Sequence, residues 1–95
     1  MKNPCALWLV NRVADIKRDG YSPRIVSYWT GSEIGHTFVT WEEFGAWYAA
    51  DDTNPRKALP YAKPTARGLA EAFLLESRSP RGTKVTRAKF EYEHT

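Results

Sequence analysis

The high density of aromatic residues is the feature that most limits how this chain can fold. The 95 residues include four tryptophans, five tyrosines and four phenylalanines. One stretch, HTFVTWEEFGAWYAADD at residues 36–52, holds Phe38, Trp41, Phe44, Trp47 and Tyr48. Because a chain of this length forms one domain with one small core, any ring that the core cannot hold must lie on the surface.

Composition predicts a single domain over residues 1–95 that is held together by packing alone. Cys5 is the only cysteine, which excludes an internal disulfide. The two histidines, His36 and His94, are far apart in the sequence, so a structural zinc site is not expected. No apolar run approaches the roughly 18 residues of a membrane-spanning helix. We therefore expect a cytoplasmic protein without metal, cofactor or membrane contact.

The first segment, NPCALWLVNRVADIKRDG, predicts a helix over about residues 4–18. Asn3 suits the N-cap and Pro4 the first helical position, and Gly20 is a suitable stop. Apolar residues recur at helical spacing between these signals. A strand over residues 7–13 is the alternative.

A β-hairpin is predicted next in the chain. PRIVSYWT (residues 23–30) and HTFVT (residues 36–40) have the β-branched and aromatic content of strands, and a glycine-containing loop joins them. Tyr28 and Trp29 point to opposite faces of such a strand. Since a small domain cannot cover both faces fully, we expect at least one of these two rings to be partly exposed.

Residues 41–50 are predicted to form a second helix. Thr40 and Glu43 have the spacing of a capping box, and Val39 and Phe44 have the spacing of a hydrophobic staple. The turn-forming sequence DDTNP follows and is expected to end the helix.

The C-terminal half contains a predicted loop, helix and strand. Three prolines and the absence of a regular period mark residues 53–64 as a Pro-rich loop. Thr65 can cap a third helix over residues 66–77. Gly68 inside that helix costs roughly 1 kcal/mol relative to alanine, which indicates that another backbone packs closely there. Apolar and charged residues alternate over residues 83–95, as in a half-buried strand.

These elements predict a small α+β domain with the order α-β-β-α-α-β. We expect about three antiparallel strands, with two or three helices packed mainly on one face of the sheet.

No residue pattern in the sequence predicts catalysis. His36 falls in the hairpin turn and His94 lies near the end of the sequence, so neither is expected to act as a general base. Asp51 and Asp52 are better explained as turn-forming or partner-binding residues than as metal ligands. We therefore do not expect an enzyme.

The basic residues raise nucleic-acid binding as an alternative. The net charge is +3, and two stretches without acidic residues, 56–67 and 78–89, hold the excess. Rings and basic side chains on one sheet face can bind single-stranded nucleic acid. The candidates are Arg24, Tyr28, Trp29, Arg87 and Lys89. However, most rings lie in residues 1–50, where five basic side chains balance five acidic ones.

The favoured hypothesis is a non-enzymatic protein-binding module. Small size, four tryptophans and dispersed arginines suit a domain that inhibits or modulates a larger complex. Accessory proteins of phages and mobile elements, including anti-CRISPR proteins, are of this kind and act in the host cytoplasm. Here the link rests on size and composition, not on a motif. We expect partner contacts at Arg24, Tyr28, Trp29 and Trp47, with Arg78, Arg81 and Lys84 tuning the association rate. Homo-oligomer formation is left open.

Overall fold

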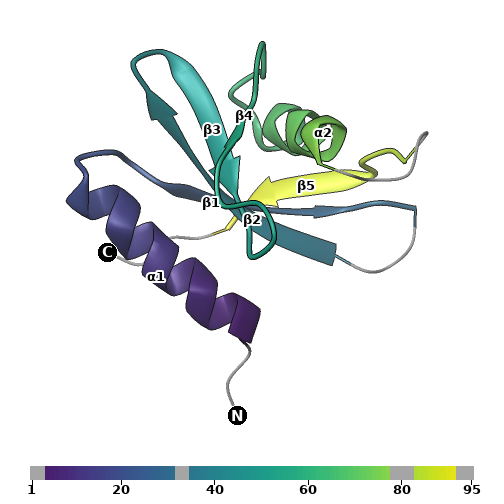
Figure 1. Ribbon diagram of the computed structural model, residues 1–95. Coiled ribbons are helices and arrows are strands. Elements are labelled where there is room, and N and C mark those ends of the chain that lie inside the picture. Colours follow the sequence, from purple (N-terminus) through teal and green to yellow (C-terminus); the bar gives the residue numbers. More distant parts are fainter. Residues whose placement is uncertain (1–3, 32–34, 78–82, 92–95) are drawn as a thin grey trace.

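A computed structural model describes residues 4–31, 35–77 and 83–91 as a five-stranded antiparallel sheet with two helices (Figure 1). The elements are α1 (Pro4–Arg18), β1 (Arg24–Trp29), β2 (Gly35–Glu43), β3 (Ala46–Ala50), β4 (Lys57–Ala58), α2 (Ala66–Glu76) and β5 (Arg87–Phe90). The strand order is β4-β3-β2-β1-β5. The small α+β fold is thus confirmed. The predicted three strands and the predicted element order are wrong in detail.

The first segment is a helix, and its end follows the local signals in the sequence. Gly20 adopts a φ of +93°. Its N–H donates to the carbonyl of Lys17 (3.0 Å), and the N–H of Tyr21 donates to the carbonyl of Ile16 (3.1 Å). This pair of bonds is a Schellman motif, which satisfies carbonyls that the helix end leaves open. The proposed N-cap, Asn3, lies outside the described residues.

The predicted helix over residues 41–50 is wrong, because this segment forms a β-hairpin. Glu43 pairs with Ala46 across a two-residue turn. Thr40 is fully buried, and its hydroxyl donates to the carbonyl of Tyr48 (2.7 Å) instead of capping a helix. The segment packs well as strands because alternate side chains reach opposite faces of the sheet. The pairing of residues 41–43 with β3 then outweighs a local capping signal.

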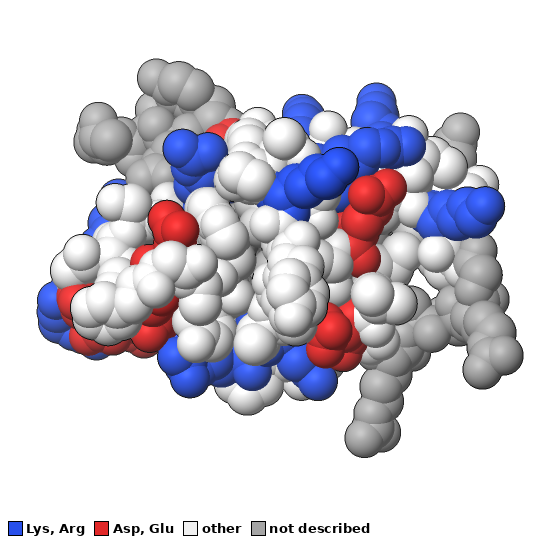
Figure 2. Space-filling model, turned by 90° about the horizontal axis from the view of Figure 1, so that it is seen from above, with Lys and Arg blue, Asp and Glu red and all other residues white. Residues whose placement is uncertain are grey.

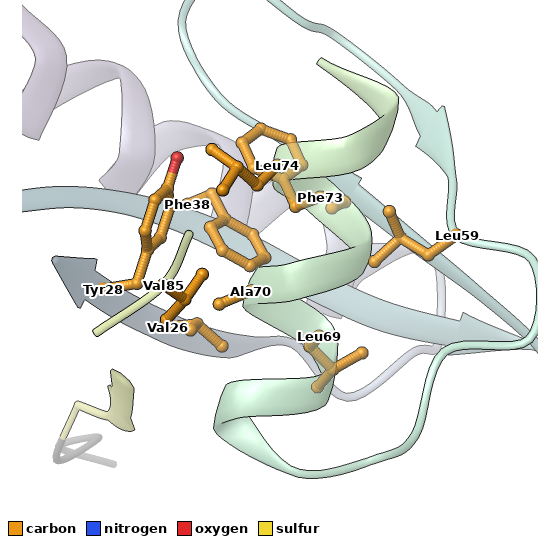
Figure 3. Close-up of a cluster of buried hydrophobic side chains, with 10 residues drawn as sticks. Val26, Tyr28, Phe38, Leu59, Leu69, Ala70, Phe73, Leu74 and Val85 are labelled. Atoms are coloured by element: carbon orange, nitrogen blue, oxygen red, sulfur yellow. The ribbon is translucent and has the colours of Figure 1, made fainter. Parts of the chain in front are cut away.

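Both faces of the sheet are apolar, and each is covered by one helix. The face under α2 carries the larger cluster, which Figure 3 shows in close-up: Val26, Tyr28, Phe38, Ala49, Leu59, Leu69, Ala70, Phe73, Leu74 and Val85. The face under α1 carries Ile16, Val39, Trp41 and Ala50. The expectation that the helices pack mainly on one face is therefore wrong. Phe38 and Val39 are adjacent in β2, and both are fully buried on opposite faces, so each face needs a cover.

The segment before α2 is more ordered than a loop. The Pro-rich residues 53–64 include the short strand β4, which pairs with β3. Thr65 caps α2 as predicted, and its hydroxyl accepts a hydrogen bond from the N–H of Gly68 (2.9 Å). A Cβ atom at Gly68 would lie 2.7 Å from the carbonyl oxygen of Lys63. This confirms the close backbone packing that the glycine indicated.

The strand predicted within residues 83–95 is present as β5, which pairs with β1 at the edge of the sheet. Residues 92–95 lie outside the described part of the chain. Among the described residues, no helix has the length and apolar character needed to cross a membrane.

Candidate functional site

The turn of the β2–β3 hairpin presents an exposed phenylalanine in an unusual backbone conformation. Phe44 has a φ of 52° and is 96 % exposed, and Gly45 follows with a φ of 86°. Two-residue hairpin turns of this kind require positive φ at both positions, which strongly favours Asn-Gly. A bulky residue at positive φ is uncommon and strained. Because the Phe44 ring is almost fully exposed, burial of its apolar surface does little to offset that strain.

A second exposed aromatic residue shows the same combination. Tyr61 has a φ of 62° and is fully exposed. It follows Pro60 in a turn that the N–H of Ala62 closes on the carbonyl of Leu59 (3.3 Å). Proline followed by a residue at positive φ is the pattern of a type II turn, whose third position favours glycine or asparagine. Within the described residues, Phe44 and Tyr61 are the two non-glycine residues at positive φ.

Both residues lie at the same end of the sheet. β4 runs antiparallel to β3, with Ala58 opposite Tyr48, and the N–H of Leu59 donates to the carbonyl of Trp47 (2.9 Å). The chain after β4 therefore runs toward the hairpin turn that carries Phe44. In Figure 1 this end of the sheet is at the top of the molecule.

A hollow of about 430 Å³ lies at the same end. Its lining includes Tyr21, Arg24, Glu42, Trp47 and Pro64. The rings of Tyr21 and Phe44 meet edge to face, with centroids 6.4 Å apart. Figure 2 looks onto this end and shows uncharged residues across the middle, with basic and acidic residues on either side. We call the surface formed by Tyr21, Arg24, Phe44, Trp47 and Tyr61 the aromatic end.

The predicted partner-binding residues do not form one surface. Arg24 and Trp47 share the hollow at the aromatic end. Trp29 lies at the opposite end of β1 and is partly exposed, whereas Tyr28 is only 6 % exposed. The expectation that one of these two rings is partly exposed is therefore confirmed. Lys84 is exposed, and Arg78 and Arg81 lie outside the described residues.

Many arginines of the described chain lie over aromatic rings. The distances from guanidinium carbon to ring centroid are 4.9 Å for Arg12 and Trp41, 5.0 Å for Arg24 and Phe90, 4.1 Å for Arg56 and Tyr48, and 3.9 Å for Arg87 and Trp29. Such cation–π pairs stabilise modestly at exposed sites. They also cover ring faces that would otherwise be free to stack on a ligand.

A second site lies at the other end of the sheet, where His36 meets Asp51. The His36 Nε2 atom is 2.7 Å from the Asp51 Oδ2 atom. The other carboxylate oxygen of Asp51 accepts hydrogen bonds from the backbone and side chains of Thr53 and Asn54. Burial alone would raise the pKa of Asp51. The hydrogen bonds from His36, from Asn54 and from two backbone N–H groups outweigh burial and lower that pKa below its ordinary value.

This pair lines a pocket of about 740 Å³ on the α2 face. The lining residues are Tyr28, His36, Asp51, Thr53, Asn54, Pro55, Arg56, Lys57, Phe73 and Ser77. The His36 ring lies parallel to Phe73, with centroids 6.3 Å apart, and meets Tyr28 edge to face. Burial, and then the charge of Asp51, raise the pKa of the Tyr28 hydroxyl. Sequence reasoning missed this site because His36 was assigned to a turn, although DDTNP did signal the turn that holds Asp51.

Neither site resembles a metal centre. Within residues 4–31, 35–77 and 83–91, no three His, Cys, Asp or Glu side chains lie close enough to hold a metal ion together. No protein-family model, curated protein or solved structure matches the chain.

Proposed function

We propose that the protein is a non-enzymatic protein-binding module that contacts its partner through the aromatic end. The observation that carries this proposal is the conformation of Phe44 and Tyr61, which are both fully exposed at positive φ. Left-handed backbone costs an ordinary residue roughly 1–3 kcal/mol, and an exposed ring recovers little of that cost by folding. A residue that strains the chain and yet is almost fully exposed is expected to serve an interaction outside it.

The neighbouring residues suit a protein contact. Trp47 is partly buried beside a hollow and Arg24 lines the same hollow. Aromatic residues and arginine are the types that dominate the energy of protein interfaces, especially around a central pocket. An inhibitor or modulator of a larger complex in the cytoplasm, of the kind that phages encode, remains the specific form of this proposal. That form rests on size and composition.

Nucleic-acid binding is the second candidate, and one observation favours it. The register places Trp29 opposite Arg87 and Ser27 opposite Lys89, so one sheet face carries a ring and two basic residues. However, the Arg87 guanidinium already lies over the Trp29 ring. Lys89 pairs with Glu91 at 3.8 Å. The surface is therefore less basic and less open than a stacking platform requires, and the protein-binding proposal is preferred.

The test compares the wild-type protein with a double variant, Phe44→Asn with Tyr61→Asn. Each protein is used to capture partners from lysate with and without nuclease treatment, and a candidate partner that is retained after nuclease is then purified and titrated. Leu75→Ser is the matched control, because Leu75 is an exposed apolar residue on α2 with helical backbone.

We expect to capture one partner protein that binds the wild type and the control with equal affinity. The same partner should bind the double variant at least tenfold more weakly. Equal affinity of the double variant for that partner contradicts the assignment of the aromatic end. Loss of all captured material on nuclease treatment supports the nucleic-acid alternative instead.

A further inference from the structure

We infer that the aromatic end binds a proline-rich segment of the partner protein in the polyproline II conformation. This inference rests on the proposed function and names the kind of segment that the surface recognises. Such segments dock on grooves lined by aromatic rings, and their extended helix forms before binding, so little conformational entropy is lost. Tyr21, Trp47 and Pro64 line the hollow, and Phe44 and Tyr61 are exposed at the same end of the sheet.

The rings of the aromatic end keep their faces free, in contrast to rings elsewhere in the molecule. Within the described residues, arginine side chains lie over four rings, and none of these belongs to the aromatic end: Trp29, Trp41, Tyr48 and Phe90. The arginine of the aromatic end, Arg24, is itself directed to Phe90. The free ring faces are therefore gathered at one place, where the apolar rings of successive prolines can pack against them.

The hollow at this end carries no net charge. Among the described residues that line it, the charged ones are Arg24 and Glu42, which have opposite charges. Figure 2 shows that uncharged residues continue across the middle of this end. An uncharged segment meets no repulsion on such a surface, whereas a polyanion requires an excess of basic side chains.

Trp47 adds a hydrogen-bond donor beside the rings. Within the described residues its indole N–H has no hydrogen-bond partner, and no buried side-chain polar atom there lacks one, so this N–H is open to solvent. An indole N–H donates and does not accept. Proline has no N–H, and polyproline II has no internal hydrogen bonds, so its carbonyl groups are free to accept. The donor of the site thus matches what a proline-rich segment offers.

The dimensions of the hollow favour an extended segment over a helix or an added strand. Arg24, Glu42 and Trp47 come from β1, β2 and β3, which are neighbours in the sheet. Strands lie about 4.8 Å apart, so the hollow crosses about 10 Å of sheet, or roughly three residues of polyproline II. An α-helix, about 10–12 Å across with its side chains, does not fit inside a hollow of about 430 Å³. The three strands are the inner strands of the sheet, so a partner strand cannot add to an open edge there.

The experiment titrates the whole chain with a decaproline peptide and with a Gly-Ser peptide of the same length, and follows backbone amide and Trp indole NMR signals. Trp47→Phe keeps an aromatic ring and removes the indole N–H. The double variant, Phe44→Asn with Tyr61→Asn, removes the two exposed rings. Trp29→Phe is the matched control, because Trp29 is also partly exposed and lies at the opposite end of β1.

We expect a saturable shift of the Trp47 indole signal with decaproline and none with the Gly-Ser peptide. Trp47→Phe should weaken decaproline binding about fivefold, as for one neutral hydrogen bond, and the double variant should weaken it by about tenfold or more. Trp29→Phe should leave the affinity unchanged. The inference is overturned by an absence of saturation with decaproline, by equal binding of the Gly-Ser peptide, or by unchanged affinity in Trp47→Phe or in the double variant.

The same variants separate this inference from the proposed function. If decaproline does not saturate while the captured partner still binds the double variant more weakly, the proline-rich segment is excluded and the aromatic end remains the contact surface. If decaproline saturates the aromatic end while the captured partner binds the double variant with equal affinity, the peptide site stands and the proposed contact with that partner is wrong.

Discussion

Replacing Phe44 with asparagine should stabilise the folded protein, although it removes a large apolar side chain. The change creates an Asn-Gly pair in the β2–β3 turn, which is the preferred sequence for two residues at positive φ. Relief of left-handed strain in an ordinary residue amounts to roughly 1–2 kcal/mol. The phenylalanine ring is 96 % exposed, so its loss sacrifices almost no burial.

One contact works against this gain. The Phe44 ring meets Tyr21 edge to face, and aromatic pairs contribute roughly 0.5–1.5 kcal/mol, with exposed pairs at the low end. The net expectation is an increase of about 0.5–1.5 kcal/mol in the free energy of unfolding, from these two contributions. In a domain of this size, each 1 kcal/mol raises Tm by roughly 4–8 °C.

Urea denaturation followed by circular dichroism measures the effect, with thermal melting as a second readout. Phe44→Ala is the informative control, because alanine also removes the ring but keeps an ordinary residue at positive φ. The asparagine variant should be more stable than the wild type, and the alanine variant should be no more stable than the wild type. If both variants lose stability equally, the ring supports the fold and the reasoning from strain is refuted.

Three further substitutions test the packing and the electrostatics. Gly68→Ala should destabilise by roughly 1–3 kcal/mol despite the better helix propensity, since its Cβ would lie 2.7 Å from the Lys63 carbonyl oxygen; an unchanged urea midpoint would contradict this contact. Thr40→Ala should cost roughly 1–3 kcal/mol by removing a buried hydrogen bond to a carbonyl, and a change within error would show that the bond is dispensable. Asp51 has a lowered pKa in the folded state, so its stabilising contribution is present above the unfolded pKa of about 3.9 and is lost as pH falls through the lower folded pKa. The stability of Asp51→Asn should therefore depend less on pH than that of the wild type in this acidic range, and parallel pH profiles would disprove the assignment.

Local sequence signals predicted both helices correctly. Pro4, Gly20 and Thr65 act on backbone groups within a few residues, through helix starts, stops and caps. Both partners of each such interaction lie in the same short segment, so the sequence of that segment is enough to identify the interaction. The same holds for Gly68, whose position inside α2 indicated that the backbone of a neighbouring residue, Lys63, packs closely against it.

The segment at 41–50 shows where local reasoning fails. A capping box at Thr40 and Glu43 and alternation on two sheet faces are both present in the same residues. The choice between them depends on strand pairing: β1 pairs with β2 up to Thr40, and residues 41–43 continue the strand by pairing with β3. Strand pairing engages both arms of the segment, and a capping box satisfies only the first turn of a helix.

By itself, the sequence determined the size, the α+β class, the two helices and the excess of rings over what one core can hold. Only the tertiary structure decided which aromatic rings lie on the surface and which polar side chains contact each other. His36 and Asp51 come together because β2 and β3 pair in one register, with Val39 opposite Ala50. Phe44 and Tyr61 share an end because β4 returns along β3. Both juxtapositions depend on strand pairing between segments that are separate in sequence, and residue spacing along the chain carries no information about that register.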